Sequence, residues 1–586
     1  MISWAILGIF FALIVPGLLM SLLVIRHSSL KAIDHFILAV PLSAAFNFFL
    51  VFLLVQLGAY STGFLRGLCL FFLGTLFVVL FIKAAQNSSV WNSQFLFKAI
   101  QSQAVIIALG LAGFVPLFYV WMTVQASGFE HWDAVATWSR WAVNWYDQSP
   151  IPSWGYPPTV PILYSLVYKM AGATHLQIYA KQVANFFPFY AMLCLWRSAS
   201  LVKQNRHVIM IAALIFLFFL ARSNKDITFI FSGYADPFMA AFAAYFFYLF
   251  VFLTHLEQNG SDLLRRYQFL TLIAISVAVP ALIKQNGLFM IAASSIFMLG
   301  YAAVHRKIAW TRLIYFGFIL GCIATSWYIY SFFKYHDYYR AEELLNPQIF
   351  LRFYQAFDMT IKRLTVVLFL VWIYANYKNK FIRQLTLYFV MPLWLLWAYL
   401  VSYDFRTAIY LLPILSFQVA VGFNTLYEDL KQFFEVKNKN YLLHISHRQL
   451  LIGCTGGVCV LLAVLPIFYK DQKLRDVDTY VRLRFHDYGF NKTINTLMAQ
   501  SSPAQKILSC DQMFANLPEA HLKFVPIGDC ENEYKIWLDR KDVKYLIYWA
   551  SFSARDPELV RQFARDAHIS FKETPMGDHY ILFEKL

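Results

Sequence analysis

Charged residues are scarce in this chain of 586 residues: they make up 14% of it, whereas hydrophobic residues make up 59%. The mean hydropathy is +0.53. Soluble domains carry about a quarter charged residues, so this scarcity excludes an ordinary soluble protein. Apolar stretches recur from residue 3 to residue 469, each near the roughly 20 residues that a helix needs to cross a bilayer. They predict an all-α polytopic membrane protein with about fourteen membrane segments.

The charge order of a signal peptide is also absent. No basic residue precedes the first apolar stretch, while Arg26 and Lys31 follow it, so we expect a retained helix with its N-terminus on the outer side. The net charge of +16 comes from basic residues that fall largely in alternate short loops. This is the positive-inside pattern rather than a patch for nucleic acid. It places the C-terminal region on the outer side as well.

Neither an internal repeat nor a zinc-like cysteine spacing is present. Five of the seven cysteines lie in apolar segments, where a thiol is usually a small hydrophobe. Cys510 and Cys530 lie in the outer C-terminal region, where an oxidising compartment would permit a disulfide. The sequence leaves open whether that bond forms, because it does not give the distance between the two Cα atoms.

A change of composition near residue 470 divides the chain. We predict a transmembrane domain over residues 1–469 and a soluble outer domain over residues 470–586. In the latter, the strand-like runs "KYLIYWA" and "HYILFEK" flank a helical "DPELVRQFARDAH". That order predicts a small α/β domain.

The outer loop over residues 126–173 contains a polar, tryptophan-rich stretch between apolar runs, "FEHWDAVATWSRWAVNWYDQSPIPSWGYPP". On a helical wheel Asp133, Thr137, Arg140 and Asn144 share one arc, and tryptophans occupy the other side. This predicts a helix that lies in the membrane interface with its polar stripe toward water. Such a helix is either a plain interfacial anchor or part of a site.

Further polar residues lie at the expected outer ends of other helices. Asp236 in "GYADPF" is either an N-cap before proline or a carboxylate that faces a cavity. Lys284 in "ALIKQNGLF" lies at a break in a long apolar stretch, and Asp404 and Arg406 lie in "SYDFRTAIYLLPIL". Either cation could simply extend to the interface, yet an arginine fork also suits phosphate. Tyr156 precedes the double proline that starts the next helix.

In their order along the chain, "FEHWD", "YPP", "GYADPF", "ALIKQNGL" and "FRTAIYLLPIL" resemble the GT-C superfamily of polyprenyl-phosphate-sugar glycosyltransferases. The branch that it resembles holds the lipid A aminoarabinose transferase and the protein O-mannosyltransferases. The resemblance covers roughly residues 105 to 425. It implies an integral protein of the bacterial inner membrane, and the loop charges described above then place both termini on the periplasmic side. It also implies transfer of a sugar from a polyprenyl-phosphate donor to a lipid, glycan or protein acceptor.

The resemblance assigns roles to residues as well. The carboxylate that takes the acceptor's proton would be Asp133, with Glu130 as the alternate, and the basic residues Lys284 and Arg406 would hold the lipid-linked phosphate. We expect the remaining substrate contacts from Arg140, Tyr156, Asp236 and Asp404. The chain departs from the family in having three helices before the loop, and it lacks a tight acidic pair. Whether a divalent metal ion takes part therefore stays open.

Two other functions compete with this hypothesis. An O-antigen ligase or polymerase also uses lipid-linked sugars but has another fold. A flippase or transporter of lipid-linked sugars would show paired halves with broken helices and ionisable groups near the bilayer midplane. Here only one break is well marked, and the polar residues gather at helix ends.

Overall fold

The computed structural model describes residues 1–25, 30–86, 133–148, 156–202, 233–259, 266–295, 310–335, 349–400, 410–437, 505–509, 524–525, 533–549, 557–576 and 580–586, except residue 175, and isolated residues between them. These residues form two compact units. The first unit is built from the residues up to 86 and from 145 to 437. The second contains residues 129 and 133–144 together with the described residues from 496 onward.

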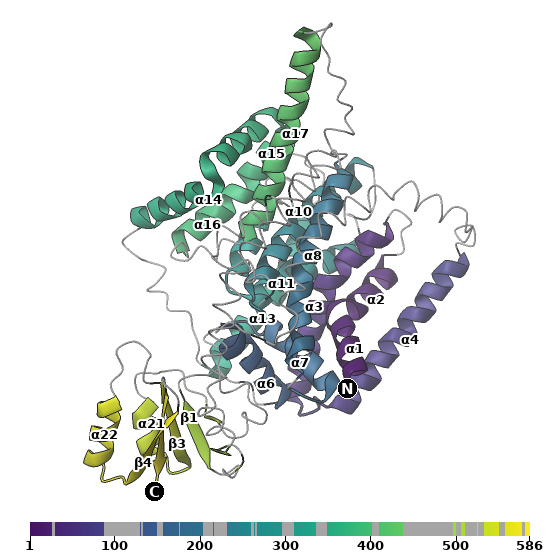
Figure 1. Ribbon diagram of the computed structural model, residues 1–586. Coiled ribbons are helices and arrows are strands. Elements are labelled where there is room, and N and C mark those ends of the chain that lie inside the picture. The colour runs from purple at the N-terminus through teal and green to yellow at the C-terminus, as the bar shows by residue number, and fades with distance from the viewer. Residues whose placement is uncertain are drawn as a thin grey trace. The chain divides into compact units, whose positions relative to one another are not determined.

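Helices make up nearly all of the first unit (Figure 1). The α-helices and one π-helix are, in chain order, α1 Ile2–Leu13, α2 Val15–Val24, α3 Ala32–Gln56, α4 Thr62–Gln86, α7 Thr159–Ala171, α8 Gln177–Leu201, α10 Asp236–Gln258, α11 Tyr267–Ile283, α13 Trp310–Tyr335, α14 Ile349–Lys378, α15 Lys380–Leu385, η6 Thr386–Val390, α16 Met391–Leu400 and α17 Leu412–Lys437.

Five of the described helices are long and apolar enough to cross a membrane, and the bent pair α1 and α2 brings the number to six. The expected fourteen segments extend over residues outside the described ranges, so that number stays a prediction. Helices α4 and α13 expose large apolar side chains over most of their length, as lipid-facing helices do. The chain is an integral membrane protein.

Close helix contacts explain some of the small residues. Gly17 of α2 packs directly on α3, where an added Cβ would lie 2.0 Å from the Ala39 carbonyl oxygen. The Gly17 amide donates a hydrogen bond to Ser43 Oγ at 2.8 Å. Glycine is therefore required at this crossing.

Aromatic side chains fill the contact between α8 and α10. The rings of Phe187 and Phe238 lie 4.0 Å apart between centroids. The buried Tyr190 and Tyr245 stack on each other, and their hydroxyls donate to Ile37 O at 2.8 Å and Ser276 Oγ at 2.7 Å. Both tyrosine hydroxyls at this contact thus have a partner, as burial away from water favours.

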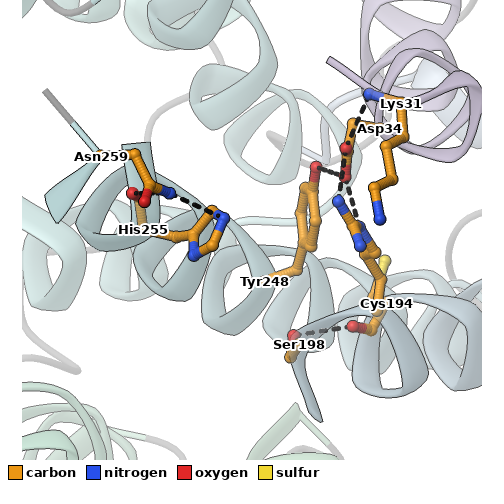
Figure 2. A network of polar contacts seen from close by, with 8 residues as sticks. Lys31, Asp34, Cys194, Ser198, Tyr248, His255 and Asn259 are labelled. Carbon is orange, nitrogen blue, oxygen red and sulfur yellow. Dashed lines mark hydrogen bonds and ion pairs between the residues drawn. The ribbon is translucent and has the colours of Figure 1, made fainter. Parts of the chain in front are cut away.

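A buried ion pair and a tyrosine that donates to it join three helices of this bundle (Figure 2). Arg197 of α8 donates from two nitrogens to the two oxygens of Asp34 on α3, each at 2.7 Å. Tyr248 of α10 donates to the same carboxylate at 2.9 Å, and the Lys31 amide donates at 3.2 Å. The Asp34 and Arg197 side chains are 1% and 7% exposed. We call these three side chains the Asp34 cluster.

The C-terminal residues of the second unit form a mixed sheet with the strand order β2-β1-β3-β5-β4. Strand β1 pairs parallel with β2 and β3, and β5 pairs antiparallel with β3 and β4. The strands are β1 Lys506–Ser509, β2 Phe524–Val525, β3 Val543–Trp549, β4 Phe571–Met576 and β5 Tyr580–Lys585.

Two helices cover one face of this sheet, α21 Glu533–Asp539 and α22 Pro557–Asp566. Trp537, Val560 and Ala564 from these helices pack against Leu546 and Phe583 of the sheet. Both predicted strands and the predicted helix are present here. Cys510 and Cys530 lie outside the described residues, so their disulfide stays a prediction.

Candidate active site

Asp236 and Lys284 form an ion pair at the ends of two neighbouring helices. Lys284 Nζ donates to Asp236 Oδ1 at 2.6 Å, and the two side chains are 14% and 7% exposed. Asp236 is the first residue of α10, and Lys284 directly follows α11. Each residue is a predicted site residue in its own segment of the sequence, and the fold brings the two into contact across 48 positions of the chain.

The end of α11 explains how Lys284 reaches this place. Lys284 leaves the helix with φ −151° and ψ 150°, and its amide still donates to the Pro280 carbonyl. At Gly287 an added Cβ would lie 2.0 Å from that same carbonyl oxygen. The break predicted at Lys284 to Gly287 is therefore present, and it needs glycine because the chain turns back onto α11.

Helix ends leave carbonyl groups without helical partners, and side chains from two other helices satisfy them here. Thr159, the first residue of α7, donates to the Leu282 carbonyl. Tyr328 of α13 donates to the Ala281 carbonyl at 2.9 Å. These two hydrogen bonds thus fix the backbone immediately before Lys284, which itself has an extended conformation.

Tyr410 lies within electrostatic range of Asp236. Its side chain is buried, with 1% exposure, and its hydroxyl has no hydrogen-bond partner among the described residues. A buried polar group without a partner costs about 1–3 kcal/mol. We call Asp236, Lys284 and Tyr410 the Asp236 cluster. It combines a cation, a carboxylate and a free O–H donor, which together suit a ligand rich in negatively charged or hydroxyl oxygens.

The double proline places α7 beside this cluster. Pro157 and Pro158 are buried, and α7 begins at the next residue, as predicted for a proline-led helix. Tyr164 of α7 donates to the Gly233 carbonyl at 3.0 Å, three residues before Asp236. Tyr156 is half-buried and precedes the prolines.

Lys169 attaches the other end of α7 to the tryptophan-rich loop. Its Nζ donates to the Tyr146 carbonyl at 2.8 Å and lies 4.4 Å from the centroid of the Tyr146 ring. Burial lowers the pKa of Lys169, and the nearby Asp147 carboxylate opposes that shift. The cation–π contact and the carbonyl compensate the buried charge in part.

The loop helix differs from the expected one. Asp133 begins a π-helix, η2 Asp133–Ser139, which continues as α6 Arg140–Tyr146. Arg140 and Asn144 are each 6% exposed, so the expectation that the polar stripe faces water was wrong for these two residues. The helical-wheel prediction treated the segment as an isolated interfacial helix, whereas the segment packs with other parts of the chain.

Several predicted site residues lie outside the described part. They are Glu130, Asp404 and Arg406. The backbone of Asp133 is described, but its side chain is not. The structure therefore brings together Asp236 and Lys284 and leaves the roles of the others as predictions. Among the described residues, no group of three His, Cys, Asp or Glu side chains could hold a metal ion.

Sequence reasoning missed Tyr410, Thr159 and Tyr328. Tyr410 was recognisable only as the tyrosine four positions after Arg406 in "FRTAIYLLPIL". No local sequence pattern indicates the contacts of Thr159 and Tyr328, because each hydroxyl bonds a carbonyl oxygen more than 40 positions away in the chain.

No protein-family model and no curated protein matches the chain. Among solved structures, ArnT from Cupriavidus metallidurans bound to undecaprenyl phosphate is similar, with a TM-score of 0.52 and 11% identity over 83% of this chain and 98% of that one. The apo structure of the same ArnT gives a TM-score of 0.48 at 11% identity, again over 83% and 98%. The chain has a GT-C fold. The expected resemblance is thereby confirmed at the level of the fold.

The similarity to the Archaeoglobus fulgidus oligosaccharyltransferase complex with zinc and sulfate is weaker. It has a TM-score of 0.38 and 14% identity over 81% of this chain and 72% of that one. Within the described residues, the motifs "YPP", "GYADPF" and "ALIKQNGL" lie at the ends of helices α7, α10 and α11 of one bundle.

Proposed function

We propose that this protein is a glycosyltransferase that moves a sugar from a polyprenyl-phosphate donor to a hydroxyl acceptor at the membrane surface. The observation that carries the proposal is the Asp236 cluster, a nearly buried Lys–Asp pair at helix ends in a chain with a GT-C fold. The ArnT structure of the same fold is bound to undecaprenyl phosphate, which supports a lipid-linked phosphate as the ligand.

In the proposed reaction the acceptor oxygen forms a bond to the anomeric carbon of the sugar. The bond from that carbon to the phosphate oxygen breaks, and its electron pair leaves with the polyprenyl phosphate. A carboxylate takes the proton of the acceptor hydroxyl. Negative charge therefore grows on the phosphate during the reaction, and a cation fixed beside it lowers the barrier.

Lys284 is our candidate for that cation. Its ammonium group sits in a site with little access to water, where a charge–charge interaction is stronger than in solution. Asp236 fixes the position of the Lys284 ammonium group and offsets part of the cost of removing it from water. Tyr410 would donate a hydrogen bond to the same ligand, since its hydroxyl is otherwise without a partner. Arg406 stays a predicted second phosphate contact.

The proton acceptor is a separate part of the proposal. We infer Asp133 from the family resemblance and its position at the start of η2, with Glu130 as the alternate. Arg140, Tyr156 and Asp404 stay candidate substrate contacts. The bacterial inner membrane, the periplasmic placement of both termini and the divalent metal also stay predictions.

Binding of undecaprenyl phosphate to the purified protein in nanodiscs tests the role of Lys284. We expect Lys284→Met to weaken binding about 10- to 100-fold, since a charge-assisted hydrogen bond contributes about 1.5–3 kcal/mol. Lys284→Arg should retain more affinity because the charge remains. The matched control is Lys378→Met, which removes an exposed lysine from the pair that Lys378 forms with Asp429 at 2.6 Å. Equal binding by wild type and Lys284→Met would refute this site.

The sugar and the acceptor require a second measurement. Mass spectrometry of lipid-linked and surface glycans, with and without the gene, should show loss of one sugar from its acceptor and accumulation of its polyprenyl-phosphate donor. An unchanged glycan profile would refute the transferase function.

A further inference from the structure

Two buried side chains of α13 have polar atoms without a hydrogen-bond partner among the described residues. These atoms are Trp327 Nε1 and Ser331 Oγ, and each residue is 2% exposed. The two residues are four positions apart in the helix, so they share one face of α13 on neighbouring turns. A buried donor without a partner is unfavourable and rare in native proteins. The pair therefore indicates a polar group that this part of the protein does not supply.

Comparable side chains in the same bundle do have partners. Ser326, also on α13, donates to a carbonyl of its own helix at 2.7 Å. The indole N–H of Trp372 donates to Gln418 Oε1 at 2.6 Å. Serine and tryptophan side chains are thus ordinarily satisfied inside this bundle, and Trp327 and Ser331 depart from that rule on one face of one helix.

Helices α11 and α13 run parallel to each other, which sets the level of this face. The Thr271 and Tyr315 hydroxyls form a hydrogen bond of 2.7 Å near the start of both helices. Toward the end of both, Tyr328 donates to the Ala281 carbonyl at 2.9 Å. The second contact therefore fixes the register between the last turn of α11 and the second half of α13.

In this register the two unpartnered side chains lie level with the candidate phosphate site. Lys284 and Ser331 each follow the second contact by three residues, in the same direction along the parallel helices. Trp327 precedes it by one residue, so it lies about 6 Å from Ser331 along the axis at about 1.5 Å per residue. A sugar on a phosphate held at Lys284 lies directly beside that phosphate, because one oxygen joins the two.

We propose that Trp327 and Ser331 bind hydroxyl groups of the donor's sugar. The inference rests on the proposed function, since the position of the sugar follows from a phosphate held at Lys284. Both side chains are neutral, so they suit an uncharged polar group rather than a second phosphate. The indole N–H only donates, whereas the serine hydroxyl donates and accepts, as a sugar hydroxyl does.

The two groups would also make the site selective among sugars. A sugar without the matching hydroxyl leaves a buried polar group of the protein unpaired, and such a mismatch discriminates strongly between substrates. Because protein encloses both atoms, the entering sugar must displace a neighbouring side chain to reach them.

The test compares two lipids that differ only in the sugar, bound to the full chain in nanodiscs. One is the polyprenyl-phosphate sugar purified from cells without the gene, and the other is the polyprenyl phosphate obtained by removing its sugar. We expect Trp327→Phe and Ser331→Ala each to weaken binding of the sugar-bearing lipid about 2- to 10-fold, since each removes one hydrogen bond. Binding of the sugar-free lipid should not change, which also shows that the variants are folded.

Helix α13 itself offers the matched controls. Trp310→Phe changes a tryptophan that is 67% exposed, and Ser326→Ala changes a serine whose hydroxyl bonds its own helix. Both control variants should bind the two lipids as the wild type does.

The outcomes separate this inference from the proposed function. Equal binding of the sugar-bearing lipid by the wild type and both variants would overturn the inference and assign enclosed water to the two atoms. Equal weakening for both lipids would also overturn it, because the role would then be structural. In either case the proposed function stands if Lys284→Met weakens binding of the sugar-free lipid. If no sugar-bearing lipid accumulates without the gene, the function fails and the inference with it. If Trp327→Phe does not fold, Ser331→Ala decides alone.

Discussion

Two charged clusters on helix α10 use similar residue types for different purposes. Both contain a carboxylate, a cation and a tyrosine, and their α10 members, Asp236 and Tyr248, lie about 18 Å apart along the helix. In the Asp34 cluster the two carboxylate oxygens accept four hydrogen bonds in total. In the Asp236 cluster, within the part of the chain that the structure describes, only Lys284 bonds the carboxylate, and the Tyr410 hydroxyl has no hydrogen-bond partner.

The difference teaches how to separate a structural ion pair from a binding site in a membrane protein. In the closed Asp34 cluster the protein itself uses the hydrogen-bonding positions of the carboxylate, so none is offered to a ligand. The cluster links α3, α8 and α10. An open cluster at helix ends retains donors that water or a ligand must satisfy. Intramembrane charges alone would have marked both clusters as functional. The hydrogen-bond inventory, rather than the charge, separates them.

The largest effect is expected at neither cluster. If the Asp236 cluster binds donor and does not take the proton, a carboxylate elsewhere must do so, and Asp133→Asn should lower turnover by about 10² to 10⁴-fold with little loss of donor binding. Steady-state transfer assays with the natural donor measure this. Near-normal turnover would move the role to Glu130 or Asp236. Near-normal turnover in all three amide variants would remove the general-base step.

The second-largest effect is expected on the free energy of unfolding, which should distinguish the Asp34 carboxylate from the Asp236 carboxylate. Asp34→Asn leaves Arg197 buried without its counter-charge, and breaking a buried pair in this way costs about 3–5 kcal/mol. Asp236→Asn should cost less, because Lys284 is more exposed and can reorient. Thermal unfolding in one detergent, with polyprenyl phosphate binding measured in parallel, provides both readouts. Equal destabilisation by the two substitutions would break the comparison.

The smallest effect is expected from the two tyrosines. Tyr248→Phe removes a hydrogen bond of 2.9 Å to Asp34 and should cost about 0.5–1.5 kcal/mol of stability without affecting ligand binding. Tyr410→Phe removes a hydroxyl without a partner, so stability should stay equal or rise slightly. The affinity of this variant for polyprenyl phosphate should fall about 2- to 10-fold, because one hydrogen bond of about 0.5–1.5 kcal/mol to the ligand is lost. Unchanged affinity in Tyr410→Phe would exclude Tyr410 from the site.

Much of the molecule was predictable from the sequence. Membrane helices follow from apolar runs, because a bilayer admits little else. The helix break at Lys284 followed from a polar, glycine-containing turn inside an apolar run, and the α/β order after residue 540 followed from local periodicity. Asp236 and Lys284 were individually recognisable, since ionisable residues at helix ends in an apolar chain are rare enough to be informative.

The sequence by itself thus determined the membrane class, the positions of many helix ends and the polar residues worth testing, because each depends on neighbours along the chain. Only the tertiary structure decided which of these residues meet. The contact of Asp236 with Lys284, the pairing of Asp34 with Arg197 and the burial of Arg140 all join or bury residues through packing between distant segments. Local pattern contains no information on such contacts, since it specifies which face of a helix is polar but not which helix lies against that face.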